Sequence, residues 1–313
     1  MLNPLESTSP LKPSPSLSPS PSPSPQVSSS LEPMPTVTPT PPPILDPLAK
    51  YGEPEIETNF NKGSDLYFFG YALSPGGAGT IGLFDNEAED DRMAQLLLPA
   101  NTPLSGPGGS SQLESYKKNY LYGTYVARFK PGSCASLKEG VVSAFFTYYN
   151  DGKDYNKNGL VDNSEIDIEI LCAEPSTIYM TLWTDYSDDE NFLKTTRKLN
   201  LKTGEILQTT LGQESKWGLN TKLKWNDDFP DINLFQNYLI FGFTWQPTYV
   251  RYFMVVQDQE YELWKYQNKK FIPQIPAYVM FNVWHNATHW HNDLPASKPN
   301  QPVKYNVDWF KLF

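Results

Sequence analysis

The chain of 313 residues has few cysteines, no long apolar run and no cluster of positive charge. No apolar segment approaches the roughly 20 residues that a membrane-spanning helix needs. The formal net charge is −10, so no basic patch is dense enough to follow a phosphate backbone. The first residues have neither the cationic start nor the apolar core of a signal peptide. We therefore expect no membrane span, no nucleic-acid partner and no signal peptide within this chain.

The chain has two cysteines, Cys134 and Cys172. Cys134 precedes one predicted strand and Cys172 ends the next, so antiparallel pairing of the two strands would bring both cysteines together. A disulfide and a pair of buried thiols are both compatible with this pattern. The spacing matches no zinc or redox motif.

Proline is concentrated at the N-terminus, where residues 1–50 consist mainly of Pro and Ser. Such a segment buries too little apolar surface to fold, and its prolines favour extended polyproline II. We predict a disordered linker over residues 1–50 and one folded domain over residues 51–313. Linkers of this kind commonly tether secreted hydrolases, which favours an extracellular or cell-surface location.

From about residue 55 onward, short apolar and aromatic runs alternate with Gly, Pro, Asn and Asp clusters. This pattern predicts an all-β domain, a two-sheet antiparallel sandwich with one core. Thr80–Gln112 and Thr203–Gln236 read as long loops. Strands are predicted near residues 66–73, 122–130, 141–149, 165–171, 178–183, 239–245, 249–256, 278–284 and 305–313.

One predicted strand, Glu165–Ile170, places three acids on one face and three isoleucines on the other, because strand side chains alternate. The isoleucines suit a buried sheet face. Three neighbouring acids without an interleaved Lys or Arg repel one another, which suggests that function requires them. An acidic, solvated edge strand is the alternative.

Glu165 and Glu169 would lie roughly 13 Å apart at Cα in an extended strand. Inward leaning of the side chains and curvature of the strand would shorten this distance toward the ~5–5.5 Å between carboxyl groups of a retaining glycosidase. In such an enzyme one carboxylate attacks the anomeric carbon and the other carboxyl group, protonated, donates to the leaving oxygen. Asp167 would hydrogen-bond one glutamate and help to set the order of ionisation.

Several segments, taken in order, resemble glycoside hydrolase family 16, which includes lichenases and xyloglucan endotransglycosylases. They are Tyr122–Lys130, Gly140–Tyr148, Glu165–Glu169, Phe243–Pro247 with Tyr249–Tyr252, Met280–Trp284 and Val307–Trp309. The resemblance covers about residues 112–313. It implies a concanavalin A-like jelly roll with a concave glucan-binding cleft and retaining hydrolysis of internal β-glucosidic bonds.

The resemblance also implies roles for single residues. Glu165 would be the nucleophile, Asp167 its assisting carboxylate and Glu169 the general acid/base. The segment after Trp284 would form the edge of the cleft. The residues expected to line the cleft and bind substrate are Phe146, Tyr148, Trp183, Trp245, Tyr252, Asn282 and Trp284.

Two details bear on the substrate. Gln112-Leu113-Glu114-Ser115 replaces the Glu-x-Arg-Ser of lichenases, so an acid stands where an arginine would touch sugar. No extra residue lies between Asp167 and Glu169, as in lichenases and xyloglucan enzymes, whereas laminarinases have a bulge that re-aims the last side chain. This favours β-1,3-1,4-glucan as substrate.

The segment from Asp154 to Glu165 fits the EF-hand calcium loop. Its twelfth position is the expected nucleophile Glu165, which cannot chelate calcium and attack a sugar at once. An Asx-rich turn is the alternative to a metal site. The expected calcium ligands are therefore Asp154, Asn156, Asn158, Leu160 and Asp162.

The sequence thus predicts a monomeric, secreted or surface-tethered endo-β-glucanase of the licheninase type that needs no cofactor for its chemistry. Its partner would be a β-glucan polysaccharide. One alternative is a xyloglucan hydrolase or transglycosylase with the same acids. The other is a carbohydrate-binding sandwich without activity, although binding alone does not require three mutually repelling acids.

Overall fold

The computed structural model of the protein describes residues 46–102, 111–186, 192–211, 214–217, 223, 232–290 and 294–313. The predicted linker lies outside these residues up to position 45. Two short 3-10 helices, η1 (Ala49–Tyr51) and η2 (Lys269–Phe271), are the helical elements of the described part. Within this part there is no helix long and apolar enough to cross a bilayer.

The predicted all-β sandwich of two antiparallel sheets is confirmed. One sheet has the strand order β15-β14-β13-β6-β17-β4-β3, with β1 paired to β17. Its strands are β1 (Ile56–Thr58), β3 (Ala78–Phe84), β4 (Arg92–Leu98), β6 (Gly123–Lys130), β13 (Leu239–Gln246), β14 (Tyr249–Val256), β15 (Gln259–Tyr266) and β17 (Val303–Leu312).

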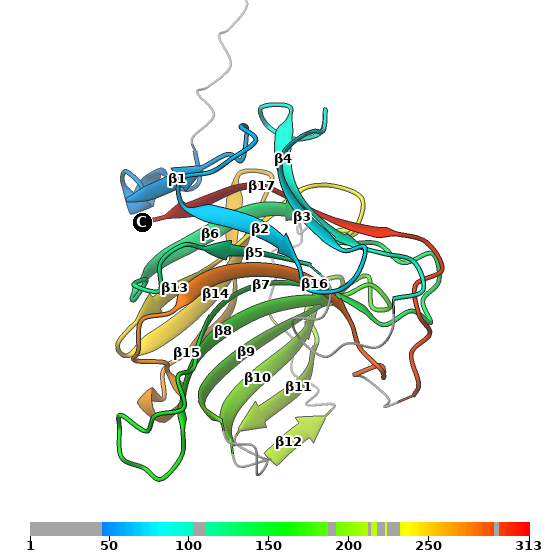
Figure 1. The fold of residues 1–313 in the computed structure, drawn as a ribbon. Helices are drawn as coiled ribbons and strands as arrows, with labels where there is room; N and C mark the ends of the chain where they lie inside the picture. Colours follow the sequence, from blue (N-terminus) through cyan, green and yellow to red (C-terminus); the bar gives the residue numbers. More distant parts are fainter. Residues whose placement is uncertain are drawn as a thin grey trace, which may run out of the picture. The chain divides into compact units, whose positions relative to one another are not determined.

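The other sheet has the order β12-β11-β10-β9-β8-β7-β16-β5-β2, and β7 to β11 lie side by side in Figure 1. Its strands are β2 (Phe68–Ala72), β5 (Ser111–Ser115), β7 (Val141–Tyr149), β8 (Asp162–Leu171), β9 (Thr177–Tyr186), β10 (Phe192–Asn200), β11 (Ile206–Leu211), β12 (Glu214–Trp217) and β16 (Tyr278–His285).

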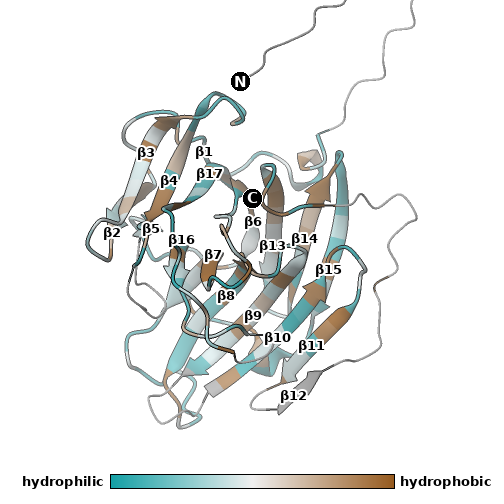
Figure 2. Ribbon diagram, turned by 90° about the vertical axis from the view of Figure 1, so that its right-hand side faces the viewer, coloured by the Kyte–Doolittle hydropathy of each residue, from teal (hydrophilic) through white to brown (hydrophobic). Residues whose placement is uncertain are grey.

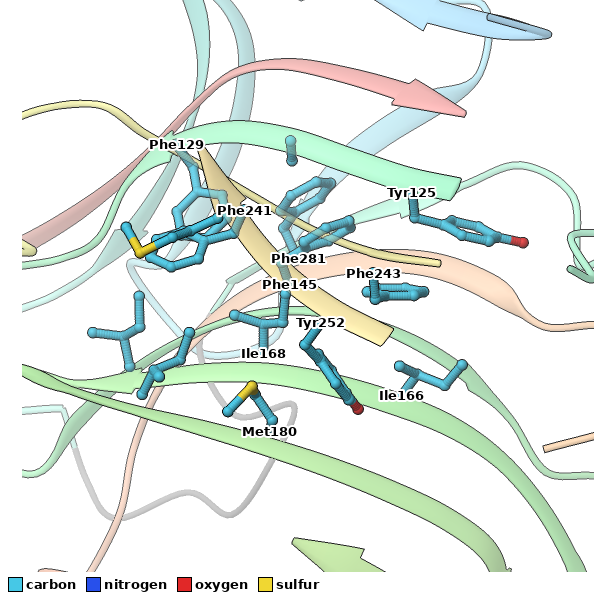
Figure 3. Packing of buried hydrophobic residues seen from close by; sticks show 14 of the residues in the cluster. Tyr125, Phe129, Phe145, Ile166, Ile168, Met180, Phe241, Phe243, Tyr252 and Phe281 are labelled. Carbon is cyan, nitrogen blue, oxygen red and sulfur yellow. The ribbon is translucent and has the colours of Figure 1, made fainter. Parts of the chain in front are cut away.

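The core lies between the sheets and is rich in aromatic rings. Phe145 of β7 and Phe281 of β16 stack with ring centroids 4.8 Å apart. Ile166, Ile168 and Ile170 of β8 are buried in the same cluster, as the alternating pattern predicts. Figure 3 shows Ile166 and Ile168 together with the rings of the core, and Figure 2 shows hydrophobic residues on strands of both sheets. The acids of β8 therefore face away from the core.

The two segments predicted to be long loops contain strands, so this prediction is wrong. Thr80–Gln112 holds β4 and most of β3, and Thr203–Gln236 holds β11 and β12. Strands β10 and β15 are also absent from the predicted set. Each of these strands pairs with the next or the preceding strand along the chain, and β10 and β15 pair with the predicted strands β9 and β14. Cross-strand pairing, rather than the local pattern alone, therefore decides them. Residues 218–222 and 224–231 lie outside the described part.

Cys134 and Cys172 form a disulfide, with their Cα atoms 5.3 Å apart. The Cys172 amide donates to the Val141 carbonyl at 2.9 Å, which fixes the end of β8 beside the start of β7. Of the two alternatives that the sequence leaves open, the structure contains the disulfide.

We expect loss of this disulfide to lower the melting temperature. A cross-link between residues 38 apart restricts the unfolded chain enough to stabilise the fold by about 4 kcal/mol. Cys134→Ser with Cys172→Ser should therefore melt about 8 °C below the wild type in a thermal unfolding scan. Dithiothreitol should lower the wild-type value similarly and leave the double variant unchanged. Equal melting temperatures with and without the cross-link would contradict this expectation.

Candidate active site

The three acids of β8 lie between two neighbouring strands in unbroken register. Asp167 pairs with Phe146 of β7 and with Thr181 of β9. The pairing with both neighbours shows no register shift from Glu165 to Glu169; the shift on β9 falls before Glu165. The three acids therefore share one face without a bulge, as the sequence predicts.

The acids open into one cavity of about 170 Å³. Trp183 of β9 stands beside them on one side, and Asn282 and Trp284 of β16 on the other. The residues that line the cavity are Ala144, Phe146, Glu165, Asp167, Glu169, Trp183, Asn282, Trp284 and Trp290. Aromatic faces and carboxyl groups thus meet in one place, which is the combination that a sugar site requires.

Two amide side chains, Asn163 and Asn282, offer hydrogen-bonding groups beside the acids. The Asn163 side-chain amide donates to Oε2 of Glu165 at 2.7 Å and so holds that carboxylate in place. Asn282 is 4% exposed, and its Oδ1 is a buried acceptor without a hydrogen-bond partner within the described residues. A buried acceptor of this kind is costly unless a ligand supplies a donor, and a sugar hydroxyl can do so.

The surroundings of the two glutamates give their carboxyl groups different pKa values. Burial raises the pKa of Glu165 to about 7, while Asn163, Asp167 and the charge of Lys194 act in the opposite direction. Burial and the charge of Glu165 raise the pKa of Glu169 to about 8. Burial raises the pKa of Asp167 well above its usual range, and both glutamate charges add to this effect. Glu165 therefore ionises before Glu169, which leaves one carboxylate and one carboxylic acid near neutral pH.

The family model for glycosyl hydrolases family 16 matches residues 84–206, a segment that contains all three acids. The resemblance to family 16 is confirmed. No curated protein sequence matches this chain.

Two solved structures share the fold. A family 16 endo-glucanase from Bacteroides ovatus is 14% identical with a TM-score of 0.52, covering 82% of this chain and 99% of that one. LamA from Z. galactanivorans, in complex with laminaritriose and laminaritetraose, is 12% identical with a TM-score of 0.51, covering 84% and 99%. At these identities the likeness concerns the fold alone.

Two residues that the family 16 resemblance assigns to the cleft lie elsewhere, so these two assignments are wrong. Trp245 and Tyr252 are fully buried between the sheets, and Figure 3 shows Tyr252 among the core residues. The Trp245 indole donates to the Pro273 carbonyl at 2.9 Å, and the Tyr252 hydroxyl donates to the Thr181 carbonyl at 2.7 Å. Alternation along β13 and β14 turns both rings inward, where no sugar reaches them.

The remaining expected cleft residues are on the face of the acids. Phe146, Trp183, Asn282 and Trp284 line the cavity. Tyr148 pairs with Glu165 on the same face, is 37% exposed and lies beyond the cavity lining. Their roles in substrate binding stay predictions.

Sequence reasoning did not single out Trp290, Asn163 or Lys194. Trp290 follows β16 and packs against Trp284, with ring centroids 5.9 Å apart. The expected cleft-edge segment after Trp284 contains Trp290 and gives a weak sign of it. Asn163 lies two residues before Glu165 on β8, so alternation along the strand could have placed it on the face of the acids. Lys194 has no such sign, because only the pairing of β8, β9 and β10 brings it to the acids.

Glu114, which replaces the arginine of lichenases, lies on β5 within the described residues. The Tyr71 hydroxyl donates to Oε2 of Glu114 at 2.7 Å, and the Gln112 side chain donates to the same oxygen at 2.8 Å. The acid is thus held by two neutral donors and presents no positive charge of the kind that an arginine would.

The predicted calcium loop folds back on itself. Amide groups of Asn158 and Gly159 donate to the Asp154 carboxylate, and the Asn156 side chain donates to Asp162. Gly159 has φ 88°, which suits the sharp turn of an EF-hand loop. The carboxylates of Asp154 and Asp162 thus accept N–H groups of the loop itself, and the described residues contain no group of three His, Cys, Asp or Glu close enough to hold a metal. Calcium binding stays a prediction.

A chelator tests this prediction. If calcium holds the loop, EDTA should lower the melting temperature by about 5 °C, the effect of losing a ligand present at 100 times its Kd. Added calcium should restore the original value, and Asp154→Asn with Asp162→Asn should abolish the response. An unchanged melting curve would show that no calcium stabilises this loop.

Proposed function

We propose that the protein is a retaining endo-β-glucanase that cleaves β-1,3-1,4-glucan by double displacement. The observation that carries the proposal is the set of three acids on one face of β8, in one cavity with aromatic rings, with the two glutamates ionising in sequence. The family 16 match over residues 84–206 supports the same class of activity.

The chemistry follows from the protonation states. Glu169, protonated, donates its proton to the glycosidic oxygen while the Glu165 carboxylate attacks the anomeric carbon. The bond to the leaving sugar breaks and a glycosyl-enzyme ester forms. Glu169, now ionised, takes a proton from water, which attacks the anomeric carbon and frees Glu165. Asp167 shares a hydrogen bond with Glu165, and burial and both glutamate charges raise the pKa of Asp167, which favours its protonated form beside the nucleophile.

The rings position the substrate. Phe146, Trp183 and Trp284 offer apolar faces to sugar rings, and the unpartnered Asn282 oxygen accepts a hydroxyl. Correct placement of the anomeric carbon near the nucleophile is a large part of catalysis, since it removes the entropy cost of bringing the groups together.

The linkage preference rests on the unbulged strand. Because no register shift separates Glu165 from Glu169, the side chain of the acid/base Glu169 keeps the orientation that is typical of lichenases. The xyloglucan enzymes share this strand form, so the same acids would serve a branched substrate in a wider cleft. An extracellular or cell-surface location is supported by the Pro/Ser-rich N-terminus and by the Cys134–Cys172 disulfide, since such bonds persist in oxidising compartments.

Incubation with mixed-linkage glucan, laminarin, xyloglucan and agarose, followed by measurement of reducing ends, tests the proposal. We expect release from mixed-linkage glucan. Release from xyloglucan alone would favour the xyloglucan enzyme, and no release from any polymer would favour a binding module.

Replacement of the nucleophile gives a sharper test. Glu165→Ala should lower kcat on the order of 10⁶-fold, the scale seen when a catalytic nucleophile is removed. Azide should restore part of the activity and yield a glycosyl azide of inverted anomeric configuration, because the small anion enters the space of the missing carboxylate. Exposed Glu262→Ala serves as the matched control. Normal hydrolysis by Glu165→Ala would refute the assignment.

The pH dependence follows from the same two groups. Activity requires ionised Glu165 and protonated Glu169, whose pKa values are about 7 and about 8. A plot of kcat/KM against pH should therefore be bell-shaped, falling below about 7 as Glu165 gains a proton and above about 8 as Glu169 loses one. A profile that is flat across this range would contradict the assignment of these roles.

A further inference from the structure

One basic side chain stands beside the three acids. Lys194 of β10 pairs with Trp183 of β9, and Trp183 pairs with Glu165 of β8. The Lys194 ammonium lies 4.4 Å from the centroid of the Trp183 ring, the same ring that lines the cavity. A cation over an indole face is attracted by the ring quadrupole, which holds the ammonium on the side of the cleft.

The acids need a cation in this position. Three carboxyl groups share one face of β8, and two negative charges there would repel each other strongly in a poorly solvated cavity. We propose that Lys194 is a positioning residue that keeps the nucleophile Glu165 ionised beside Asp167 and Glu169, through its charge and through its seat on Trp183.

The charges around the site agree with this role. Lys194 favours the ionised forms of Glu165 and Glu169, and all three acids favour the charged form of Lys194 against the effect of burial. From β8 the groups facing Lys194 are Glu165, Asp167 and Glu169. Other groups also surround the acids. Asn163 hydrogen-bonds Glu165, Trp183 hydrogen-bonds Asp167, and the neutral phenols of Tyr252 and Tyr179 lie near Asp167 and Glu169.

The second lysine on the same face of β10 has a different partner. Lys198 is buried and pairs with Glu174 at 2.7 Å, over the ring of Tyr179. Glu174 thus compensates the charge of Lys198, and Lys198 does not contribute to the pKa shift of Glu165 or of Glu169. Lys194 is therefore the lysine of this strand that acts on the reacting carboxylates.

Substitutions that separate charge from size test the inference. Lys194→Met keeps the aliphatic stem on Trp183 and removes the charge, whereas Lys194→Arg keeps the charge and stacks on the ring. Without the cation both glutamates hold protons more tightly. The kcat/KM profile of Lys194→Met should therefore move to higher pH by about one unit at both limbs. Lys194→Arg should keep the wild-type limbs.

The control is Lys265→Met. Lys265 makes the same kind of contact, 4.7 Å from the Tyr249 ring centroid, but is exposed on β15 of the other sheet. Its profile should match the wild type. Unmoved limbs in Lys194→Met, or an equal shift in Lys194→Arg, would overturn the proposed role.

This kinetic test rests on the proposed glucanase activity, so a second measurement does without it. In protein labelled with carboxyl-¹³C glutamate, the resonances of Glu165 and Glu169 are assigned from Glu165→Gln and Glu169→Gln and titrated by NMR. Lys194→Met should move both midpoints to higher pH by about one unit. A wild type that cleaves no glucan would refute the function while leaving this result intact. Unmoved midpoints in an active enzyme would refute the role of Lys194 alone.

Discussion

Burial of three neighbouring carboxyl groups on one strand is the constraint on which the rest of the site depends. Water would stabilise these charges, and its partial exclusion raises the pKa of all three. The fold tolerates the cost because the reverse face of the same strand buries Ile166, Ile168 and Ile170 in the main core. One strand therefore contributes to stability through one face and presents the candidate catalytic acids on the other.

The order of ionisation arises from unequal surroundings of like residues. Glu165 has a donor in Asn163 and a hydrogen bond with Asp167, whereas Glu169 is influenced chiefly by burial and by the charge of Glu165. Two glutamates four positions apart in the chain can thus hold opposite protonation states at the same pH. Such a division of roles between two carboxyl groups is what a double displacement requires.

The strands on the two sides of β8 contribute different side chains to the cavity. Asn282 of β16 lies on one side of β7 and β8, and Trp183 and Lys194 of β9 and β10 lie on the other. Aromatic rings therefore line both flanks of the cavity, Trp284 on the side of Asn282 and Trp183 on the side of Lys194. Trp290 lines the cavity and packs against both Trp284 and Tyr179, the residue that pairs with Glu169 across β8 and β9.

The sequence by itself determined the sandwich, the shared face of the acids and the absence of a bulge, because alternation is a local property that two residues suffice to define. It misplaced Trp245 and Tyr252, since a strand pattern without a known partner does not say which face is the core. Only the tertiary structure decided the disulfide, the strands within the expected loops, and the approach of Lys194 to the acids. Each of these depends on which strand lies beside which, and the energy of that choice comes from contacts between strands rather than from the pattern within one strand.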